Sequence, residues 1–163
     1  MKKYSKEDQR IMATWALDCA YRVIPIFEAI YPKDDRPSKA IKAGREWVRT
    51  GIFSMPIIRG ASLGAHAAAK QVGISDAASF AAHAAGQAVA TAHVPQHAYG
   101  GAYYALKAIA AAKPINAGLN INSEREWQSQ HLPEHLRQEI MDRIIVEKRK
   151  NGFFITVRKD QDF

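Results

Sequence analysis

Four histidines within one alanine-rich stretch are the residues of this sequence whose type and spacing could do chemistry. His66, His83, His93 and His97 lie between residues 61 and 112. Neutral imidazoles serve proteins as metal ligands, as acid–base groups and as hydrogen-bonding partners. The residues around the histidines decide between these roles.

A metal site is one possibility. His93 and His97 are four residues apart, a spacing that places two imidazoles on one face of a helix. His83 falls on the same side, within an arc of about 120° at the helical period. Such a site would use His83, His93 and His97, with Asp18 or Asp35 as a carboxylate ligand.

The local pattern does not favour that metal site. The helical zinc-protease motif needs a glutamate directly after the first histidine, whereas Val94 follows His93 and Pro95 precedes His97 by two residues. The stretch also contains no Glu-x-x-His pair of the di-iron type. Because buried polar groups are nearly always paired, we favour a structural role for the histidines and Gln87, as hydrogen-bonding partners that join helices. No cofactor is expected.

A second group of polar candidates lies nearer the start of the chain. Asp18 sits among apolar residues, and we expect it to pair with a histidine or with Arg36, because an unpaired buried charge is costly. Cys19 beside it is expected to be a small core residue rather than a nucleophile. Asp34, Asp35 and Arg36 are most simply a helix start and a surface ion pair. If there is a functional pocket, it is predicted where this loop meets the histidines.

The elements that would hold these residues are helices. Alanine is the best helix former, and residues 77–106 contain no charged side chain, so this part is predicted to be central and surrounded. Ser75 is expected to cap the helix that contains His83, with Asp76 in its first turn. The first expected helix runs from about residue 6 to the low twenties, and Pro25 either kinks it or opens another. The other expected helices cover 38–49, 61–72, 76–93, 96–112, a short segment after 123, and 133–151. Residues 153–157 are β-branched and aromatic, and are expected to form an extended tail or one strand.

These elements predict an all-α, single-domain compact helical bundle or array over residues 1–163. It would have about six to eight helices, an Ala/His-rich core and a short extended C-terminal tail. A membrane span is not expected, because the uncharged run is alanine rather than leucine and is interrupted by histidines. Apolar surface left exposed on the alanine-rich helices would indicate a homodimer.

Charge and cysteine content narrow the choice of partner and compartment. The net charge is +7 and the isoelectric point is near 9.6, which favours acidic partners. The basic residues are scattered, without the clustering typical of nucleic-acid binding, so a nucleic-acid partner is not favoured. A single cysteine permits no internal disulfide and fits the cytoplasm.

Several segments in order resemble one bacterial family. The most specific are residues 15–20 (WALDCA) and 34–37 (DDRP), and the others are 23–28 (VIPIFE), 45–47 (REW), 85–88 (AGQA), 91–94 (TAHV) and 132–137 (LPEHLR). This order is similar to the Imm-5-like immunity protein family of polymorphic toxin systems. The resemblance implies a cytoplasmic, non-enzymatic protein that binds and silences a cognate toxin by direct contact, and it carries over no catalytic residues.

Overall fold

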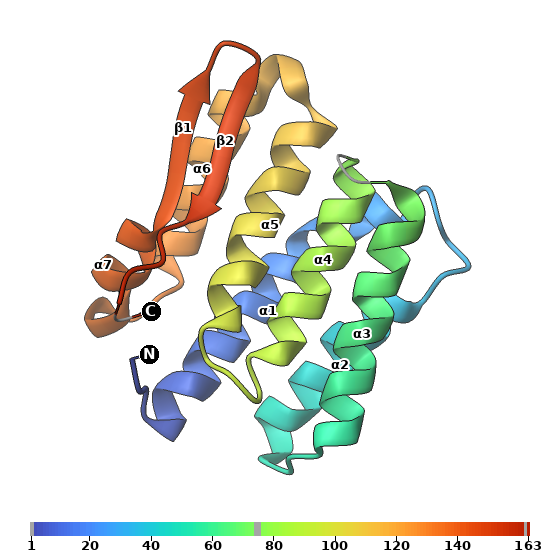
Figure 1. Ribbon diagram of the computed structural model, residues 1–163, viewed down its shortest axis with the longest axis vertical. Coiled ribbons are helices and arrows are strands. Elements are labelled where there is room, and N and C mark those ends of the chain that lie inside the picture. The colour runs from blue at the N-terminus through green and yellow to red at the C-terminus, as the bar shows by residue number, and fades with distance from the viewer. Residues whose placement is uncertain (1, 74–75, 162) are drawn as a thin grey trace.

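The alanine-rich stretch forms two neighbouring helices at the centre of the molecule, α4 (Ala77–Ala90) and α5 (His97–Ala112). The computed structural model describes residues 2–73, 76–161 and 163. α4 contacts α5, α1 (Lys6–Glu28), α2 (Arg36–Thr50) and α3 (Met55–Val72), so it is surrounded as predicted (Figure 1).

Small side chains allow the central helices to approach closely. A Cβ added to Gly101 on α5 would lie 3.1 Å from the Cβ of Ala16 on α1 and 3.4 Å from that of Ala88 on α4. A larger residue at any of these positions would push the helices apart. The small residues of this stretch are therefore what allows its helices to pack at the centre of the molecule.

The first half of the chain follows its sequence signals, with three refinements. α3 begins at Met55, six residues before the expected start at residue 61. α1 is one continuous helix with Pro25 inside its last turn, so the proline opens no second helix. α2 ends at Gly51, whose φ of 71° is the left-handed conformation that glycine adopts most readily. At the start of α4 the capping residue is Asp76, whose carboxylate accepts from the amide of Ala78 at 2.7 Å. The predicted cap at Ser75 lies outside the described residues.

The C-terminal part corrects three predictions. A 3₁₀ turn (η1, Pro114–Asn116) leads into α6 (Ala117–Gln130), where a loop and then a helix capped at Ser123 were expected. The last helix, α7 (Glu134–Arg143), ends about two turns earlier than predicted. The chain continues as β1 (Ile144–Arg149) and β2 (Gly152–Val157), which pair as an antiparallel hairpin.

The fold is mostly helical, with this hairpin as a small second layer. The buried Ile144 and Ile155 attach the hairpin to the same hydrophobic core as the helices. β2 lies on the α5 side of the hairpin and β1 on the far side, over α6 (Figure 1). Within the described ranges, no helix has the length and apolar character needed to cross a lipid bilayer.

Candidate functional site

The solvent side of the central helices carries almost no charge. In α4 the only side chains that are not buried are Ala77, Phe80, His83 and Gln87. Exposed helix faces of soluble proteins normally carry charged residues. Together with residues of α3 and α5 these side chains form what we call the histidine–tyrosine face: His66, Phe80, His83, Gln87, His97, Tyr103, Tyr104 and Lys107.

His66 on α3 and His83 on α4 are bonded to each other across the helix interface. Their Nδ1 atoms are 2.7 Å apart, so one ring donates and the other accepts. Gly86 leaves room for this pair, since a Cβ there would be 2.9 Å from the His66 ring. Burial lowers the pKa of His66 to about 4, and burial followed by the charge of Lys70 lowers that of His83. Both rings are therefore neutral near pH 7, and in complementary tautomers one Nδ1 carries the proton that the other accepts.

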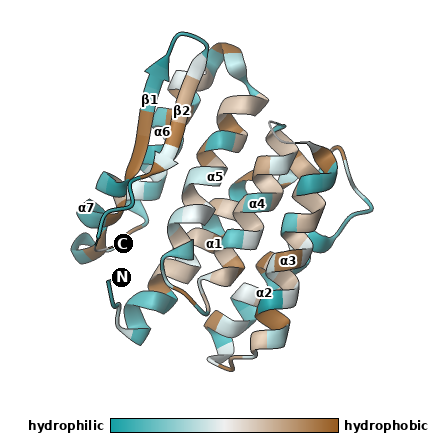
Figure 2. Ribbon diagram, viewed as in Figure 1, coloured by the Kyte–Doolittle hydropathy of each residue, from teal (hydrophilic) through white to brown (hydrophobic). Residues whose placement is uncertain are grey.

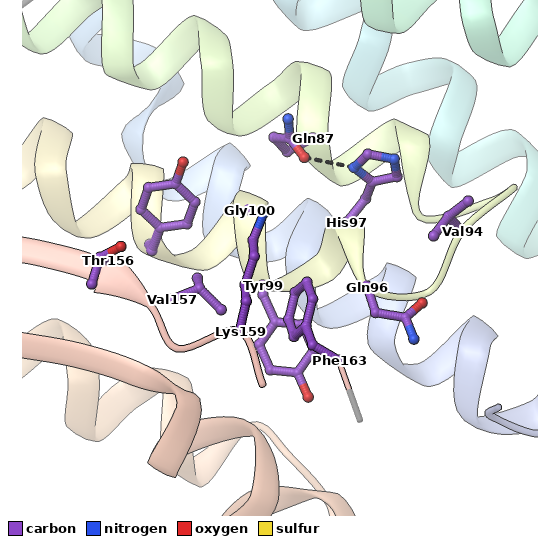
Figure 3. A pocket seen from close by; sticks show the side chains of 11 residues that line it. Gln87, Val94, Gln96, His97, Tyr99, Gly100, Thr156, Val157, Lys159 and Phe163 are labelled. Carbon is purple, nitrogen blue, oxygen red and sulfur yellow. Dashed lines mark hydrogen bonds between the residues drawn. The ribbon is translucent and has the colours of Figure 1, made fainter. Parts of the chain in front are cut away.

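Gln87 and His97 form a second pair at the end of α4 and the start of α5. The Nδ1 of His97 donates to the Oε1 of Gln87 at 2.7 Å (Figure 3). Gly100 makes room for the glutamine, because a Cβ at this position would lie 2.5 Å from the same Oε1. Burial lowers the pKa of His97 to about 4. His93 is exposed, and its ring centroid is 5.1 Å from that of His97.

Aromatic rings continue this face along α5. Tyr104 stacks on His83 at 5.0 Å and on Tyr103 at 4.3 Å between ring centroids. The ammonium of Lys107 lies 5.2 Å from the Phe80 centroid and 5.6 Å from that of Tyr104. Burial lowers the pKa of Lys107. The face thus combines π-rich rings with one partly desolvated cation, a combination found at recognition surfaces.

Two cavities lie between this face and the C-terminal hairpin. One, of about 400 Å³, is bounded by Gln87, His97 and Tyr103 on the helices and by the end of β2 and Lys159 opposite (Figure 3). The other, of about 540 Å³, is bounded by Phe80, Lys107 and the first residues of β2. Both are large enough to take side chains of a bound molecule.

The residues considered for a metal site do not converge. Among the described residues no three His, Cys, Asp or Glu side chains form a group that could hold one ion. His83 bonds to His66, and His97 bonds to Gln87. Each of these hydrogen bonds occupies one nitrogen of the histidine ring. The histidines instead make hydrogen bonds between helices α3, α4 and α5.

Asp18 pairs with neither of its expected partners. Its side chain is 43% exposed and its Oδ1 lies 3.2 Å from the Nη2 of Arg45 on α2. The expectation of a buried carboxylate was therefore wrong, because α1 turns this position towards α2 at the surface. Cys19 beside it is buried, and burial raises the pKa of its thiol. A buried, protonated thiol is a poor nucleophile.

The loop before α2 is fixed by ion pairs away from the histidines. Arg36 donates to Asp34 at 2.6 and 2.8 Å and to Gln71 on α3 at 2.5 Å. The guanidinium lowers the pKa of Asp34. Asp35 is exposed and pairs with Lys39 at 2.9 Å. This loop borders an open surface hollow of its own, at residues 30–34, and the cavities next to the histidines are bordered by β2 instead.

On α5 only His97 was predicted, and Tyr103, Tyr104, Lys107 and the hairpin residues of the site were not. Tyr104 and Lys107 follow His97 at seven and ten residues, which places all three on one side of a helix. That spacing was available as a signal. Thr156 and Lys159 could not be found in this way, since they reach the site only through the hairpin.

A separate apolar surface lies at the other edge of the molecule. Ile52 and Phe53 in the α2–α3 connection are 45–76% exposed, as are Met55, Ile57 and Leu63 on α3. Of the three alanine-rich helices, α4 and α5 are mostly buried, whereas α3 exposes Leu63 at this surface.

One comparison with known proteins identifies a family. The model of the Imm-5 like putative immunity protein family matches residues 2–135, from the residues before α1 into α7. Neither the curated proteins nor the solved structures contain a significant match. The matched residues contain the whole histidine–tyrosine face and most of the core, and the chain belongs to the Imm-5-like family of putative immunity proteins.

Proposed function

We propose that this chain is an immunity protein that binds a cognate bacterial toxin and blocks it by direct contact, without catalysing a reaction. Family membership supports the class of function. The observation that supports binding is the histidine–tyrosine face, which is partly exposed and bordered by two cavities, and whose only charges are cationic, Lys107 within it and Lys70 beside it. Interfaces gain most of their free energy from such aromatic residues at positions that a partner can desolvate.

The charge of the protein fits an acidic partner. A net charge of +7 steers a negatively charged protein towards the surface and raises the association rate. Because the only cysteine is buried and no internal disulfide is possible, we place this binding in the cytoplasm.

A non-enzymatic mechanism is supported by how the polar groups are used. The rings of His66, His83 and His97 bond to neighbouring side chains of the protein itself. The thiol of Cys19 is buried and protonated. These groups stabilise the fold, and we infer that toxin inactivation comes from covering part of the toxin surface.

Co-expression with the product of a toxin gene adjacent to its own gene tests this proposal. We expect cells to survive and the two proteins to co-purify as a stable complex. Rescue of the cells without any complex, or rescue through chemical modification of the toxin, would contradict the proposal.

A matched pair of variants locates the surface. Tyr103→Asp places a charge in the histidine–tyrosine face and should weaken toxin binding by more than about tenfold. Ile57, on the apolar surface of α3, is 62% exposed. Ile57→Asp introduces the same charge there and should leave toxin binding unchanged. The reverse pattern would keep direct binding but exclude the histidine–tyrosine face. Urea unfolding of both variants checks that each is folded.

A further inference from the structure

One edge of the hairpin has free backbone hydrogen-bonding groups. The amide of Arg158 donates to the carbonyl of Arg143 at 2.8 Å, in register with the β1–β2 ladder. Because hydrogen-bonded and non-bonded pairs alternate along an antiparallel ladder, the N–H and C=O groups of Phe153, Ile155 and Val157 point away from β1. Within residues 2–73, 76–161 and 163, nothing bonds to these outward groups.

The composition of β2 makes this edge a site for strand pairing. Residues 152–157 read Gly-Phe-Phe-Ile-Thr-Val, with high β-propensity and no charge. Figure 2 shows the contrast with the upper part of β1, which is hydrophilic. An uncharged, open edge strand is a template for another strand, and proteins usually protect such edges with charges or a covering element.

The opposite edge of the hairpin is protected in this way. The guanidinium of Arg125 donates to the carbonyl of Ile144 at 2.6 Å. Glu147, Lys148 and Arg149 place charges along the remainder of β1. The two edges thus differ, and only the β2 edge is left suitable for pairing.

The space beside β2 lies over the histidine–tyrosine face. The hairpin packs on the helices through Ile144 and Ile155, and β2 is the strand that contacts α5. A strand added at the usual spacing of about 4.8 Å from β2 would therefore continue the hairpin layer across α5 and α4 (Figure 1). Its two ends would meet the two cavities, which border the beginning and the end of β2.

We propose that an extended, acidic segment of the toxin adds to the free edge of β2 as a third strand and covers the histidine–tyrosine face. Backbone hydrogen bonds to Phe153, Ile155 and Val157 would hold the segment, and alternate side chains would point into the cavities, as in other cases of strand addition. This inference rests on the proposed function, and it specifies how the partner is held.

The charges around the groove indicate an acidic segment. Among the described residues lining the two cavities, the charged ones are Lys107 and Lys159, and both are cations. The ammonium of Lys107 contacts aromatic rings, and burial lowers its pKa. A carboxylate brought next to a partly desolvated ammonium is stabilised more than one in bulk water.

Amide hydrogen exchange of the ¹⁵N-labelled protein, free and bound to the toxin encoded by the adjacent gene, tests the strand addition. In the free protein the amides of Ile155 and Val157 should exchange fast, while those of Phe154 and Thr156, which bond to β1, should be protected. In the complex the outward amides should become protected, by at least about tenfold, because each would then donate to the added strand.

The possible outcomes separate strand addition from the immunity function itself. A complex that forms while Ile155 and Val157 still exchange fast would overturn strand addition and leave the immunity function standing. Absence of any complex would overturn both. A free protein that is already dimeric, with these amides protected, would show that a second copy of the chain occupies the edge.

A charge-reversal pair tests the chemistry of the segment without touching the hairpin. Lys107→Glu should weaken toxin binding by about tenfold or more, with the loss shrinking at high salt. Lys42→Glu changes the net charge equally on the exposed surface of α2 and should have little effect. Equal losses for both variants would show that only the overall charge matters, and would overturn the acidic-segment assignment.

Discussion

Stability should fall between pH 8 and pH 5 because two histidines are held neutral by burial. Burial lowers the pKa of His66 and of His97 from 6.5 to about 4. In this range the unfolded chain binds protons that the folded protein does not, so the free energy of unfolding decreases as the pH falls through 6.5. The stabilisation is fully present at a pH above 6.5, the pKa of histidine in the unfolded chain. It is lost progressively as the pH falls to about 4, the pKa in the folded protein.

The size of the effect follows from the shifts. At about pH 5 each unfolded histidine has gained about 2 kcal/mol of protonation free energy relative to about pH 8, at 1.36 kcal/mol per pH unit. Because both side chains are partly exposed, solvent screening reduces the combined value for His66 and His97 from about 4 to about 2 kcal/mol. The lowered pKa values of His83 and His93 act in the same direction.

Urea unfolding followed by far-UV circular dichroism at a series of pH values measures this slope. The His66→Gln/His97→Gln double variant is the control, and its free energy of unfolding should vary much less over the same range. If the free energy of unfolding of the unmodified protein stays constant between about pH 8 and about pH 5, burial of the histidines does not lower their pKa values as stated. The same conclusion follows if the double variant keeps the full pH slope.

Two further predictions concern packing and a half-buried ion pair. Gly100→Ala should destabilise the fold by about 1–3 kcal/mol, because the new Cβ would lie 2.5 Å from Gln87 Oε1. Gly60→Ala should instead stabilise α3 by up to about 1 kcal/mol, because its new Cβ would have no neighbouring atom within 4 Å. Equal effects of the two substitutions in urea titrations would refute the packing argument. Arg22→Ala should cost about 3 kcal/mol, since it leaves Glu124, 6% exposed, without its bidentate partner at 3.0 Å. If the Arg22→Ala variant has the same midpoint of thermal unfolding as the unmodified protein, within error, the predicted loss of stability is wrong.

The helical half of the fold was predictable because local signals and packing agree there. The uncharged run between residues 77 and 106 predicted central helices, and α4 is enclosed by four others. The helix expected to end at residue 49 ends at Thr50, and Gly51 after it adopts the left-handed conformation. These signals act within a few residues, so the sequence alone contains them.

The hairpin was not predicted, because its local pattern is ambiguous. Leu136, Ile140 and Ile144 recur every four residues, which is typical of a helix that continues. The chain instead changes to a strand at Ile144, whose β-branched neighbours pair with residues 155–157. The two-residue turn is followed by Gly152 at φ 132°, a conformation that favours glycine, at the position where the expected helix over 133–151 would have ended.

The site was predicted only as a set of residues. Clustering of His66, His83, Gln87 and His97 is visible in the sequence, and all four belong to the face described here. Which ring bonds to which depends on how α3 and α5 pack against α4, a tertiary relation that no spacing contains. The candidate group at residues 34–36 lies elsewhere, because its arginine bonds to the end of α3.

Titrating the activity of the toxin with increasing amounts of this protein tests direct, non-catalytic inhibition most directly. A protein that blocks by binding should reduce toxin activity in proportion to the amount added, reaching zero at about one equivalent when the toxin concentration is far above Kd. Complete inactivation by a small fraction of an equivalent would show turnover, and full toxin activity at excess would show that no inhibitory complex forms. Either result would contradict the account.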